Sequence, residues 1–407
     1  MKTRILVVAP YPIKTPMHGG QKRTQALVRR YRELSSNVTF IAVYLADSYK
    51  DGYKSDIAIT NQKIQKQLKQ HRELTDILAG TALIQDDTAK LKFSALLKRI
   101  KPQVVHIEQP YMVEPVSDIL KELNLKSLII FGSQNVESEM KRGIYKLQLS
   151  NEDLRALVKR TEEVERMAVK RADIILAVSG YDLLTLRSWN KFTPGYVVSN
   201  GIESPLKYTP KINQWSLFKK DDNIQQIATF IGSAHPPNYF GFRELVSGIK
   251  LVPAARIVVA GGVSEVIRSN YKTDDTIWDT VFAAGVLPSA SLHSLIHESD
   301  IILLPILNGG GSNLKTAEAI ISHKKIVATQ YAFRGYEKYL SLPNIYLANS
   351  PKAFERALDA AIKSDYIPLT RHQQKLADSV TWAHALINIR YVLIAACIIR
   401  IIRKLRV

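Results

Sequence analysis

The chain has 407 residues, of which 46% are hydrophobic and 23% are charged, a composition that indicates a globular protein with two or three domains. The single cysteine, Cys397, excludes a disulfide framework and is typical of a reducing compartment. The formal net charge of +19 indicates either an anionic partner or a basic surface with no single purpose. Because the basic residues are spread along the chain without zinc-finger spacing or an RNP-type strand, we exclude nucleic acid as that partner.

The first half of the chain alternates short apolar runs with helical stretches, the pattern of a parallel sheet that is buried on both faces. The first run, Ile5–Ala9, ends at Pro10 and is shorter than the core of a signal peptide, so we interpret it as a buried strand and expect a cytoplasmic protein. Residues 151–173 have the pattern of a long helix. Strands are predicted at 4–10, 38–45, 103–109, 127–134, 173–179 and 195–201.

The second half repeats this pattern, so the sequence predicts two successive doubly wound, Rossmann-like domains. The join is expected between Gly201 and about Gln225, a polar stretch with two prolines and no period. The expected domains are 1–203 and 204–380, followed by a crossing helix and a basic tail at 381–407. Strands are predicted at 227–233, 255–262, 280–286, 300–306, 324–330 and 344–349.

Small residues follow four predicted strands of the second half, at the carboxyl ends where open α/β sheets bind ligands. A glycine at a strand end is an ordinary turn residue, but four such ends converge on one edge of the sheet. In two sheets that face each other, this edge lines the cleft between the domains. The four ends are Gly232 and Ser233 continuing to Asn238, then Gly261, then Gly285 with Val286, and finally Gly309 to Gly311.

The last of these ends belongs to "LNGGGSNLKTAEAI", residues 307–320, which leads from a strand into a helix. The glycines let the backbone approach a ligand, and the N–H groups at the helix start suit a diphosphate. Lys315 adds a cation, and Glu318 lies one turn later on the same face. Two alternatives stay open: a P-loop in which Leu314 replaces the required glycine, or a solvated pair of Lys315 and Glu318 after a flexible turn.

The stretch "GGGSNLKTAEA" resembles a Gly-rich version of the donor-site signature in family 4 of the retaining glycosyltransferases. The resemblance continues in order along the chain, through "HGGQKRTQALVRRYREL", "PQVVHIEQP", "SQNVESEMKR", "ERMAVKRADIILAVSGYD", "VVSNGIE", "FIGSAHPPN", "ARIVVAGG" and "GVLPSASLHSLIHESDIILLPI". It implies an α/β protein of the GT-B fold, with an N-terminal acceptor-side domain and a C-terminal nucleotide-sugar domain that face an inter-domain cleft.

The resemblance also implies a nucleoside-diphosphate sugar as the donor, with its diphosphate at Gly311 to Lys315 and its ribose at Glu318. Two positions depart from the family: Gly310 stands where a first Glu is usual, and Gln134 where many members have His. The expected donor-binding residues are Gly19, Gly20, Gly232, Ser233, Asn238, Gly261, Gly285, Val286, Gly310, Gly311, Ser312, Asn313, Leu314, Lys315 and Glu318.

Three residues are candidates for catalysis: Lys315, Glu108 and His18. Lys315 would stabilise the charge that develops on a departing diphosphate. Glu108 is preferred to His106 because it lies nearer the carboxyl end of its strand, whereas His106 is interpreted as a buried strand residue. No cofactor is expected besides the donor substrate, and no metal, because no Cys or His cluster has ligand spacing.

Residues 391–407 read as a basic amphipathic segment. Its apolar run, Tyr391–Ile399, is shorter than the roughly 20 residues that cross a bilayer. We expect this segment to contact an anionic membrane surface; the alternative is that its apolar face packs on the first domain. On a helical wheel one face carries Ile394, Ile398, Ile401, Ile402 and Leu405, with Arg400, Arg403 and Lys404 opposite and Arg406 near the edge.

The sequence and the resemblance together predict a retaining, metal-independent glycosyltransferase of the hexosyl type. Its acceptor would be a saccharide or a lipid-linked hydroxyl in bacterial surface polysaccharide or glycolipid synthesis, and the protein would lie peripherally on the inner face of the cell membrane. Two other function classes stay open. One is a non-catalytic GT-B homologue acting as a partner subunit, and the other is a P-loop-like NTPase, against which Leu314 counts.

Overall fold

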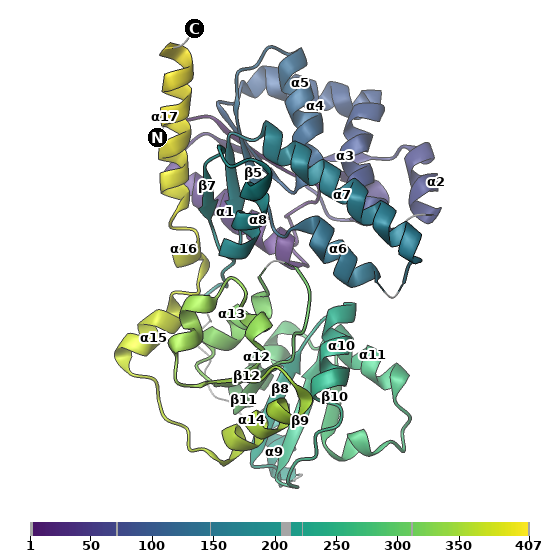
Figure 1. Ribbon diagram of the computed structural model, residues 1–407, viewed down its shortest axis with the longest axis vertical. Coiled ribbons are helices and arrows are strands. Elements are labelled where there is room, and N and C mark those ends of the chain that lie inside the picture. The colour runs from purple at the N-terminus through teal and green to yellow at the C-terminus, as the bar shows by residue number, and fades with distance from the viewer. Residues whose placement is uncertain are drawn as a thin grey trace. The chain divides into compact units, whose positions relative to one another are not determined.

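The computed structural model describes residues 3–70, 72–146, 148–204, 213–221, 223–310 and 312–405. It separates into two compact units, Met1–Asn200 with Ala385–Val407, and Gly201–His384 (Figure 1). Part of the polar stretch expected to join the domains, residues 205–212 and 222 with both of its prolines, lies outside the described residues. The C-terminal segment returns to the unit in which the chain begins.

The first unit is built on a seven-stranded sheet in the order β3-β2-β1-β4-β5-β6-β7, in which every pair of neighbours is parallel. Every residue of β1, β4, β5 and β6 is buried, because helices cover both faces of the sheet and leave no solvated side. The strands are β1 Ile5–Ala9, β2 Val38–Leu45, β3 Ile57–Ile59, β4 Val104–Glu108, β5 Leu128–Gly132, β6 Ile174–Ala177 and β7 Gly195–Val197.

The helices of this unit show how local sequence sets their ends. In α7, Ser150 accepts a hydrogen bond from the backbone N–H of Asp153 at 3.1 Å, and Lys170 and Arg171 lie in the last turn, where the helix dipole favours positive charge. The helices are α1 Gly19–Leu34, α2 Gln62–Gln70, α3 Thr75–Gln85, α4 Asp87–Ile100, α5 Val113–Glu122, α6 Glu137–Tyr145, α7 Asn151–Arg171, α8 Gly180–Trp189 and α17 Ile389–Leu405.

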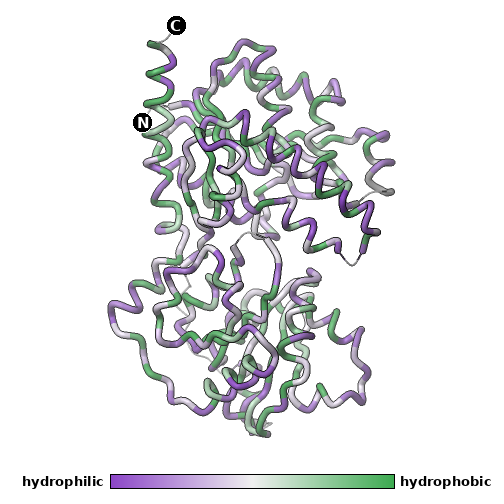
Figure 2. The backbone as a smooth tube through the Cα atoms, in the orientation of Figure 1, coloured by the Kyte–Doolittle hydropathy of each residue, from purple (hydrophilic) through white to green (hydrophobic). Residues whose placement is uncertain are grey.

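The second unit is built on a six-stranded parallel sheet in the order β10-β9-β8-β11-β12-β13. Its strands are β8 Gln226–Ile231, β9 Ala255–Ala260, β10 Val281–Gly285, β11 Ile301–Leu304, β12 Lys325–Ala328 and β13 Ile345–Leu347. Its helices are α9 Gln214–Asp221, α10 Pro236–Leu245, α11 Gly262–Asn270, α12 Ser289–Glu298, α13 Leu314–Ile321, α14 Pro351–Lys363 and α15 Arg371–Asp378; α16, Trp382–Ala385, leads back to the first unit. In Figure 2 the inner strands of both sheets carry the hydrophobic colour.

The predicted pair of doubly wound sheets is confirmed, and each of the twelve predicted strands forms. The sequence reading missed β3, because three residues with an exposed alanine at the centre are too short to show a period. The predicted helix at 151–173 is α7.

One segment of the described residues, Trp382–Arg403, is long and apolar enough to cross a membrane when judged by length and composition alone. This corrects the sequence estimate, which ended the apolar run at the arginines on either side of Tyr391–Ile399. In this structure, 28% of the segment's apolar window is buried.

Candidate functional site

Both sheets reverse their strand order at one place, and this is where open α/β sheets bind ligands. In the first unit the reversal lies between β1 and β4, and in the second it lies between β8 and β11. Connections from the two adjacent strands diverge there to opposite faces of the sheet and leave a crevice beyond the strand ends. Each unit therefore has one such place, and the sequence candidates gather at both.

In the second unit the glycine-rich connection from β11 to α13 is tied down by the segment after β12. The Thr329 hydroxyl donates to the Ile306 carbonyl, and the Tyr331 hydroxyl donates to the Gly309 carbonyl. Gly309 has φ +136°, a conformation that side chains disfavour, and a Cβ there would meet open space. Gly310 is half-buried, and the expected donor residue Gly311 lies outside the described residues.

Lys315 lies in the first turn of α13, and its ammonium donates a hydrogen bond to the side-chain carbonyl of Asn238 on α10. Its Nζ also lies 5.6 Å from the centroid of the Phe230 ring. Burial lowers the pKa of Lys315 to about 8, although the Glu318 carboxylate acts in the opposite direction. The hydrogen-bond partner is a neutral amide, so the contact leaves the positive charge available to an anion.

Asn238 is held in the orientation that suits this contact. Its Nδ2 donates to the backbone carbonyl of Ser233 at 2.9 Å and to the Ser233 hydroxyl at 3.2 Å. Both donor hydrogens therefore point toward the end of β8, which turns the carbonyl oxygen toward Lys315. The structure thus brings together three residues that the sequence predicted separately, Ser233, Asn238 and Lys315.

The glycines at the ends of β8, β9 and β10 contact one another. The Gly261 N–H donates to the Gly285 carbonyl at 2.8 Å, and a Cβ at Gly261 would lie 2.4 Å from the Gly232 carbonyl oxygen. Gly261 and Gly285 both have positive φ, at +90° and +76°. The next residue, Val286, is 72% exposed. Glycine at position 261 permits this close approach, so the backbones at the ends of the three strands pack directly against one another.

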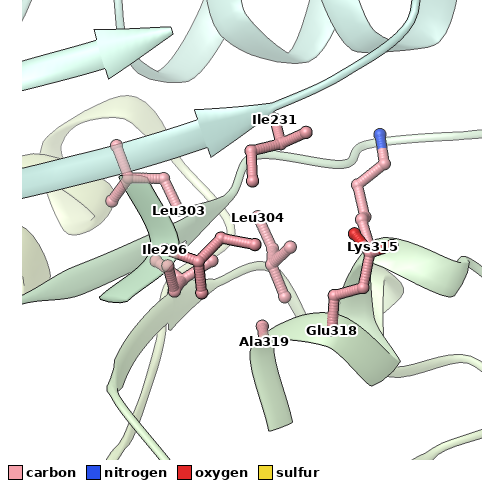
Figure 3. A pocket seen from close by; sticks show the side chains of 8 residues that line it. Ile231, Ile296, Leu303, Leu304, Lys315, Glu318 and Ala319 are labelled. Atoms are coloured by element: carbon pink, nitrogen blue, oxygen red, sulfur yellow. The ribbon is translucent and has the colours of Figure 1, made fainter. Parts of the chain in front are cut away.

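A small cavity lies against α13, but it is not where a substrate binds. Its volume is about 10 Å³, which is room for about one water molecule, and its lining is mostly aliphatic. Figure 3 shows Lys315 and Glu318 rising from α13 at one side of this cavity, with Leu304 and Ile231 opposite. The polar contacts of Lys315 lie outside it, at the ends of the strands.

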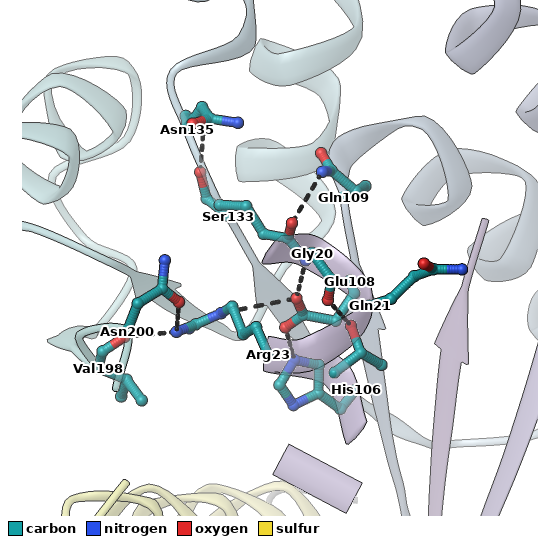
Figure 4. Close-up of polar contacts among 12 residues, drawn as sticks. Gly20, Gln21, Arg23, His106, Glu108, Gln109, Ser133, Asn135, Val198 and Asn200 are labelled. Atoms are coloured by element: carbon teal, nitrogen blue, oxygen red, sulfur yellow. Dashed lines mark hydrogen bonds and ion pairs between the residues drawn. The ribbon is translucent and has the colours of Figure 1, made fainter. Parts of the chain in front are cut away.

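In the first unit Glu108 lies at the carboxyl end of β4, with its side chain completely buried in a polar network (Figure 4). One carboxylate oxygen is 2.8 Å from Nε2 of His106; the other accepts a hydrogen bond from Gln134 at 2.5 Å and lies 3.7 Å from Nε of Arg23. Burial raises the pKa of Glu108, but the hydrogen bond from His106 and the charge of Arg23 outweigh it, so the pKa lies below its usual value.

Both oxygens of the Glu108 carboxylate contact other protein groups (Figure 4). In this structure the carboxylate therefore positions its neighbours and does not face an open site. His106 is fully buried, as the sequence indicated, and its Nδ1 lies 2.7 Å from the Tyr31 hydroxyl. The Gln134 side chain donates both to Glu108 and to the Tyr11 hydroxyl. A catalytic role for Glu108 stays a prediction.

Arg23 is a member of this network that sequence reasoning missed. It is fully buried on α1, and its Nη1 donates to the Val198 carbonyl at 2.8 Å and to the Asn200 side chain at 3.1 Å. Its Nη2 is buried without a hydrogen-bond partner. The sequence does contain one signal for its burial. Arg23 lies four residues before Leu27, so both side chains lie on the same buried face of α1.

His18 is the N-cap residue of α1, and its hydrogen bonds define its tautomer. Its Nδ1 accepts a hydrogen bond from the Gln21 N–H at 3.4 Å as the N-cap, so the neutral ring carries its proton on Nε2. The ring packs edge-to-face on Tyr11 at 5.1 Å, and Nε2 lies 3.4 Å from the Tyr49 hydroxyl. Desolvation lowers the pKa of His18, so at neutral pH the Nε2–H is a hydrogen-bond donor rather than a base.

Gly20 lies in the first turn of α1 at the same place as His18. A Cβ there would lie 2.5 Å from the Gln134 side-chain oxygen and 3.0 Å from the Tyr11 hydroxyl. Gly19 is exposed one residue before it. Glycine therefore lets the start of α1 pack directly against the polar network.

Two further residues near the donor candidates were not predicted. His235 precedes α10, and its pKa is lowered by desolvation and by the charge of Lys315. Arg334 donates from Nη1 to the Tyr331 hydroxyl at 3.1 Å, which links a cation to the residue that holds Gly309. The connection after β12 has the sequence "TQYAFRG". A basic residue that follows a strand end was the sequence signal that could have identified Arg334.

The described residues contain no group of three or more His, Cys, Asp or Glu side chains that could hold a metal ion. Two adjacent carboxylates, Asp86 and Asp87, lie at the start of α4, where Asp86 is the N-cap residue and accepts a hydrogen bond from the Ala89 N–H at 2.9 Å. That contact is an ordinary helix cap.

No protein-family model matches the sequence, and no curated protein matches it. Solved structures do match over nearly the whole chain. Sucrose-phosphate synthase from Thermosynechococcus elongatus is 12% identical with a TM-score of 0.67, over 97% of this chain and 100% of that one. The apo lipopolysaccharide outer core galactosyltransferase WaaB is 11% identical with a TM-score of 0.64, over 97% and 99%.

A third match is HepE from Anabaena in complex with UDP, which is 13% identical with a TM-score of 0.57, over 99% of this chain and 100% of that one. At such low identity these likenesses show the fold. The chain has the GT-B fold, as the resemblance in the sequence implied.

Proposed function

We propose that this GT-B protein is a glycosyltransferase that moves a sugar from a nucleoside-diphosphate sugar to a hydroxyl acceptor with retention of anomeric configuration. One observation carries the proposal: Lys315, a desolvated cation with a neutral hydrogen-bond partner, lies at the start of α13 beside the strand-order reversal of the second sheet. A half-buried cation at a helix N-terminus is a site for a diphosphate.

In the proposed sugar transfer, this site has to stabilise the departing diphosphate. When the bond between the sugar and the diphosphate breaks, negative charge grows on the diphosphate, and preorganised donors lower the barrier. Lys315 supplies a point charge, and the backbone N–H groups at the start of α13 supply dipoles that the Asn313 side chain does not cap. Glu318 would bind the ribose hydroxyls, and the strand ends at Gly261 and Gly285 would lie beside the nucleotide base.

The remaining features are proposed on the resemblance in the sequence. The acceptor is a saccharide or a lipid-linked hydroxyl in bacterial surface polysaccharide or glycolipid synthesis, received on the side of the first unit where His18 and Gly20 lie. The protein is a metal-independent hexosyltransferase that needs no cofactor besides its donor. It works in the cytoplasm at the inner face of the cell membrane, which fits a chain with a net charge of +19.

A second candidate function is a non-catalytic homologue that acts as a partner subunit. Two residues favour it: Gly310, where a sugar-binding Glu is usual, and Gln134, whose amide is already engaged by Tyr11 and Glu108. The P-loop alternative is weaker. That motif needs a glycine directly before its lysine, and here this position is Leu314, the first residue of α13.

The test begins with a thermal-shift screen of UDP-, GDP- and dTDP-sugars against the full chain. A stabilising donor is then incubated with candidate acceptors, and the anomeric configuration of the product is read by NMR. Transfer with retention supports the proposal. Stabilisation by ATP or GTP with phosphate release would establish the NTPase, and the absence of any response to nucleotide sugars would favour the non-catalytic subunit.

A further inference from the structure

The C-terminal helix α17 has two apolar faces, and only one of them packs against the first unit. The inner face consists of Ile389, Val392, Leu393 and Ala396, each at most 1% exposed. Polar contacts hold the helix along its length. The Asn388 side chain donates to the Val197 carbonyl at 3.3 Å, and the Arg403 guanidinium forms an ion pair with Asp173. The helix is therefore a fixed part of the unit (Figure 1).

The outer face of α17 is also apolar. Six exposed apolar side chains form this face. At about 100° per residue they lie within one stripe roughly a quarter of the helix circumference wide, on the side opposite the inner face. Hydrophobic colour accordingly appears along the helix in Figure 2. The exposed fractions are Tyr391 54%, Ile394 45%, Ile398 51%, Ile401 58%, Ile402 43% and Leu405 81%. The five large aliphatic side chains in this row form a contiguous exposed apolar patch, and such patches mark interaction surfaces.

The charge of the segment that carries this face indicates what covers the face. The segment Ala385–Val407 contains the basic residues Arg390, Arg400, Arg403, Lys404 and Arg406 and no acidic residue. Exposed basic side chains of α1, Lys22 and Arg32, lie on the helix next to α17. A second copy of this chain would bring like charges together, whereas an anionic lipid surface supplies the opposite charge.

We propose that the outer face of α17 docks the protein on an anionic lipid surface, with the helix lying in the plane of the interface and these side chains inserted below the headgroups. The alternative of crossing the bilayer conflicts with the contacts of the inner face. The 17 residues of α17 span about 26 Å, and crossing would pull four buried side chains away from the unit they pack on. This proposal rests on the geometry of α17 and not on the proposed sugar transfer.

Flotation of the full chain with lipid vesicles tests the proposal. One set of vesicles is phosphatidylcholine, and the other contains about one third phosphatidylglycerol. The wild-type protein is expected to float with the anionic vesicles, and the substitutions Ile394→Ser, Ile398→Ser and Ile402→Ser together are expected to reduce the bound fraction at least about tenfold. High salt should weaken binding as well.

A control replaces three apolar side chains that are more exposed than these and lie elsewhere on the first unit, Leu91→Ser, Leu184→Ser and Phe192→Ser, and it should float like the wild type. Circular dichroism checks that both triple variants fold. Equal flotation of the α17 variant and the wild type overturns the proposal. So does a dimer that the α17 substitutions dissociate, since the occupant is then a second copy, or membrane association that resists alkaline carbonate, since the helix then spans the bilayer.

Discussion

Lys315 at the start of α13 donates a hydrogen bond to the side-chain carbonyl of Asn238 on α10, so the two helices that flank the strand-order reversal of the second sheet meet at one polar contact. Asn238 is fixed in turn by Ser233 at the end of β8. The contact orients a desolvated cation without neutralising it. This is the preorganisation that an anion site needs, because the charge is in place before the ligand arrives.

Replacement of Lys315 by Ala is expected to reduce sugar transfer by about 10²- to 10³-fold, or roughly 3 kcal/mol of transition-state stabilisation, because the leaving diphosphate loses its cation. The melting temperature should not fall, since burial disfavours the charged form of this lysine. Initial rates and thermal melts measure the two effects. Lys352→Ala, an exposed lysine of the same unit, is the control, and near-normal transfer by the Lys315 variant would argue against this site.

Donor affinity should fall as the pH rises through about 8, the pKa to which burial lowers Lys315. Below that value the free protein carries the cation, and above it the neutral amine must take up a proton when the diphosphate binds. The dissociation constant is then expected to rise by up to about tenfold per pH unit. Calorimetry in buffers of different ionisation enthalpy at pH 8.5, a value chosen to lie about half a unit above that pKa, would show this proton uptake. An affinity that stays constant across the range would contradict it.

Two substitutions at Asn238 separate its roles. Asn238→Ala removes the acceptor but leaves the charge of Lys315, whereas Asn238→Asp places a carboxylate where the amide was and pairs the ammonium. We therefore expect the Asp variant to bind nucleotide more weakly than the Ala variant, by about tenfold, and to raise the pKa of Lys315. Titration of UDP or GDP by thermal shift compares them. The opposite order would mean that an acceptor that orients the Lys315 ammonium matters more for binding than an unpaired positive charge.

The fold could be predicted because buried parallel strands are continuous apolar runs in the sequence, and twelve of them stood out. The donor candidates could be named because glycine marks strand ends. Their partners could not, because the contact between Lys315 and Asn238 joins residues 77 positions apart and depends on the sheet order. Strand order is a tertiary property that local periodicity does not contain.

Two other residues show where sequence reasoning ends. Glu108 was placed correctly at the end of its strand, but its contact with Arg23 joins residues far apart in the sequence, which local periodicity does not contain. In the tail, the wheel found the apolar face that is exposed in α17. It did not find the inner face with Val392 and Ala396, because an apolar stripe looks the same whether it packs on protein or not.

Gly261 is expected to tolerate no side chain. A Cβ there would lie 2.4 Å from the Gly232 carbonyl oxygen, and the backbone has φ +90°, so Gly261→Ala should cost about 1 to 3 kcal/mol of strain and shift the ends of β8 and β9 apart. Nucleotide binding should weaken along with thermal stability. Gly248→Ala is the matched control, because a Cβ there meets nothing within 4 Å. Equal behaviour of the two variants in melts and nucleotide titrations would rule out this close approach.

The buried pair of Arg23 and Glu108 is expected to stabilise the first unit in a pH-dependent way. The pKa of Glu108 in the folded protein lies below its usual value, so the pair contributes stability above the pKa of the unfolded chain and loses it as the pH falls through the lower folded value. Glu108→Ala leaves a buried guanidinium unpaired and should cost about 3 to 5 kcal/mol at neutral pH.

The double replacement Arg23→Met with Glu108→Gln removes both charges and should recover part of this loss, since no buried charge is left unpaired. Hydrogen exchange of the β4 amides at pH 7 and pH 4 reports on this unit separately from the second one. If the double variant regains stability and also transfers sugar, Glu108 acts through position alone. If it regains stability and stays inactive, the carboxylate takes part in the reaction, and the buried network must open when the acceptor binds.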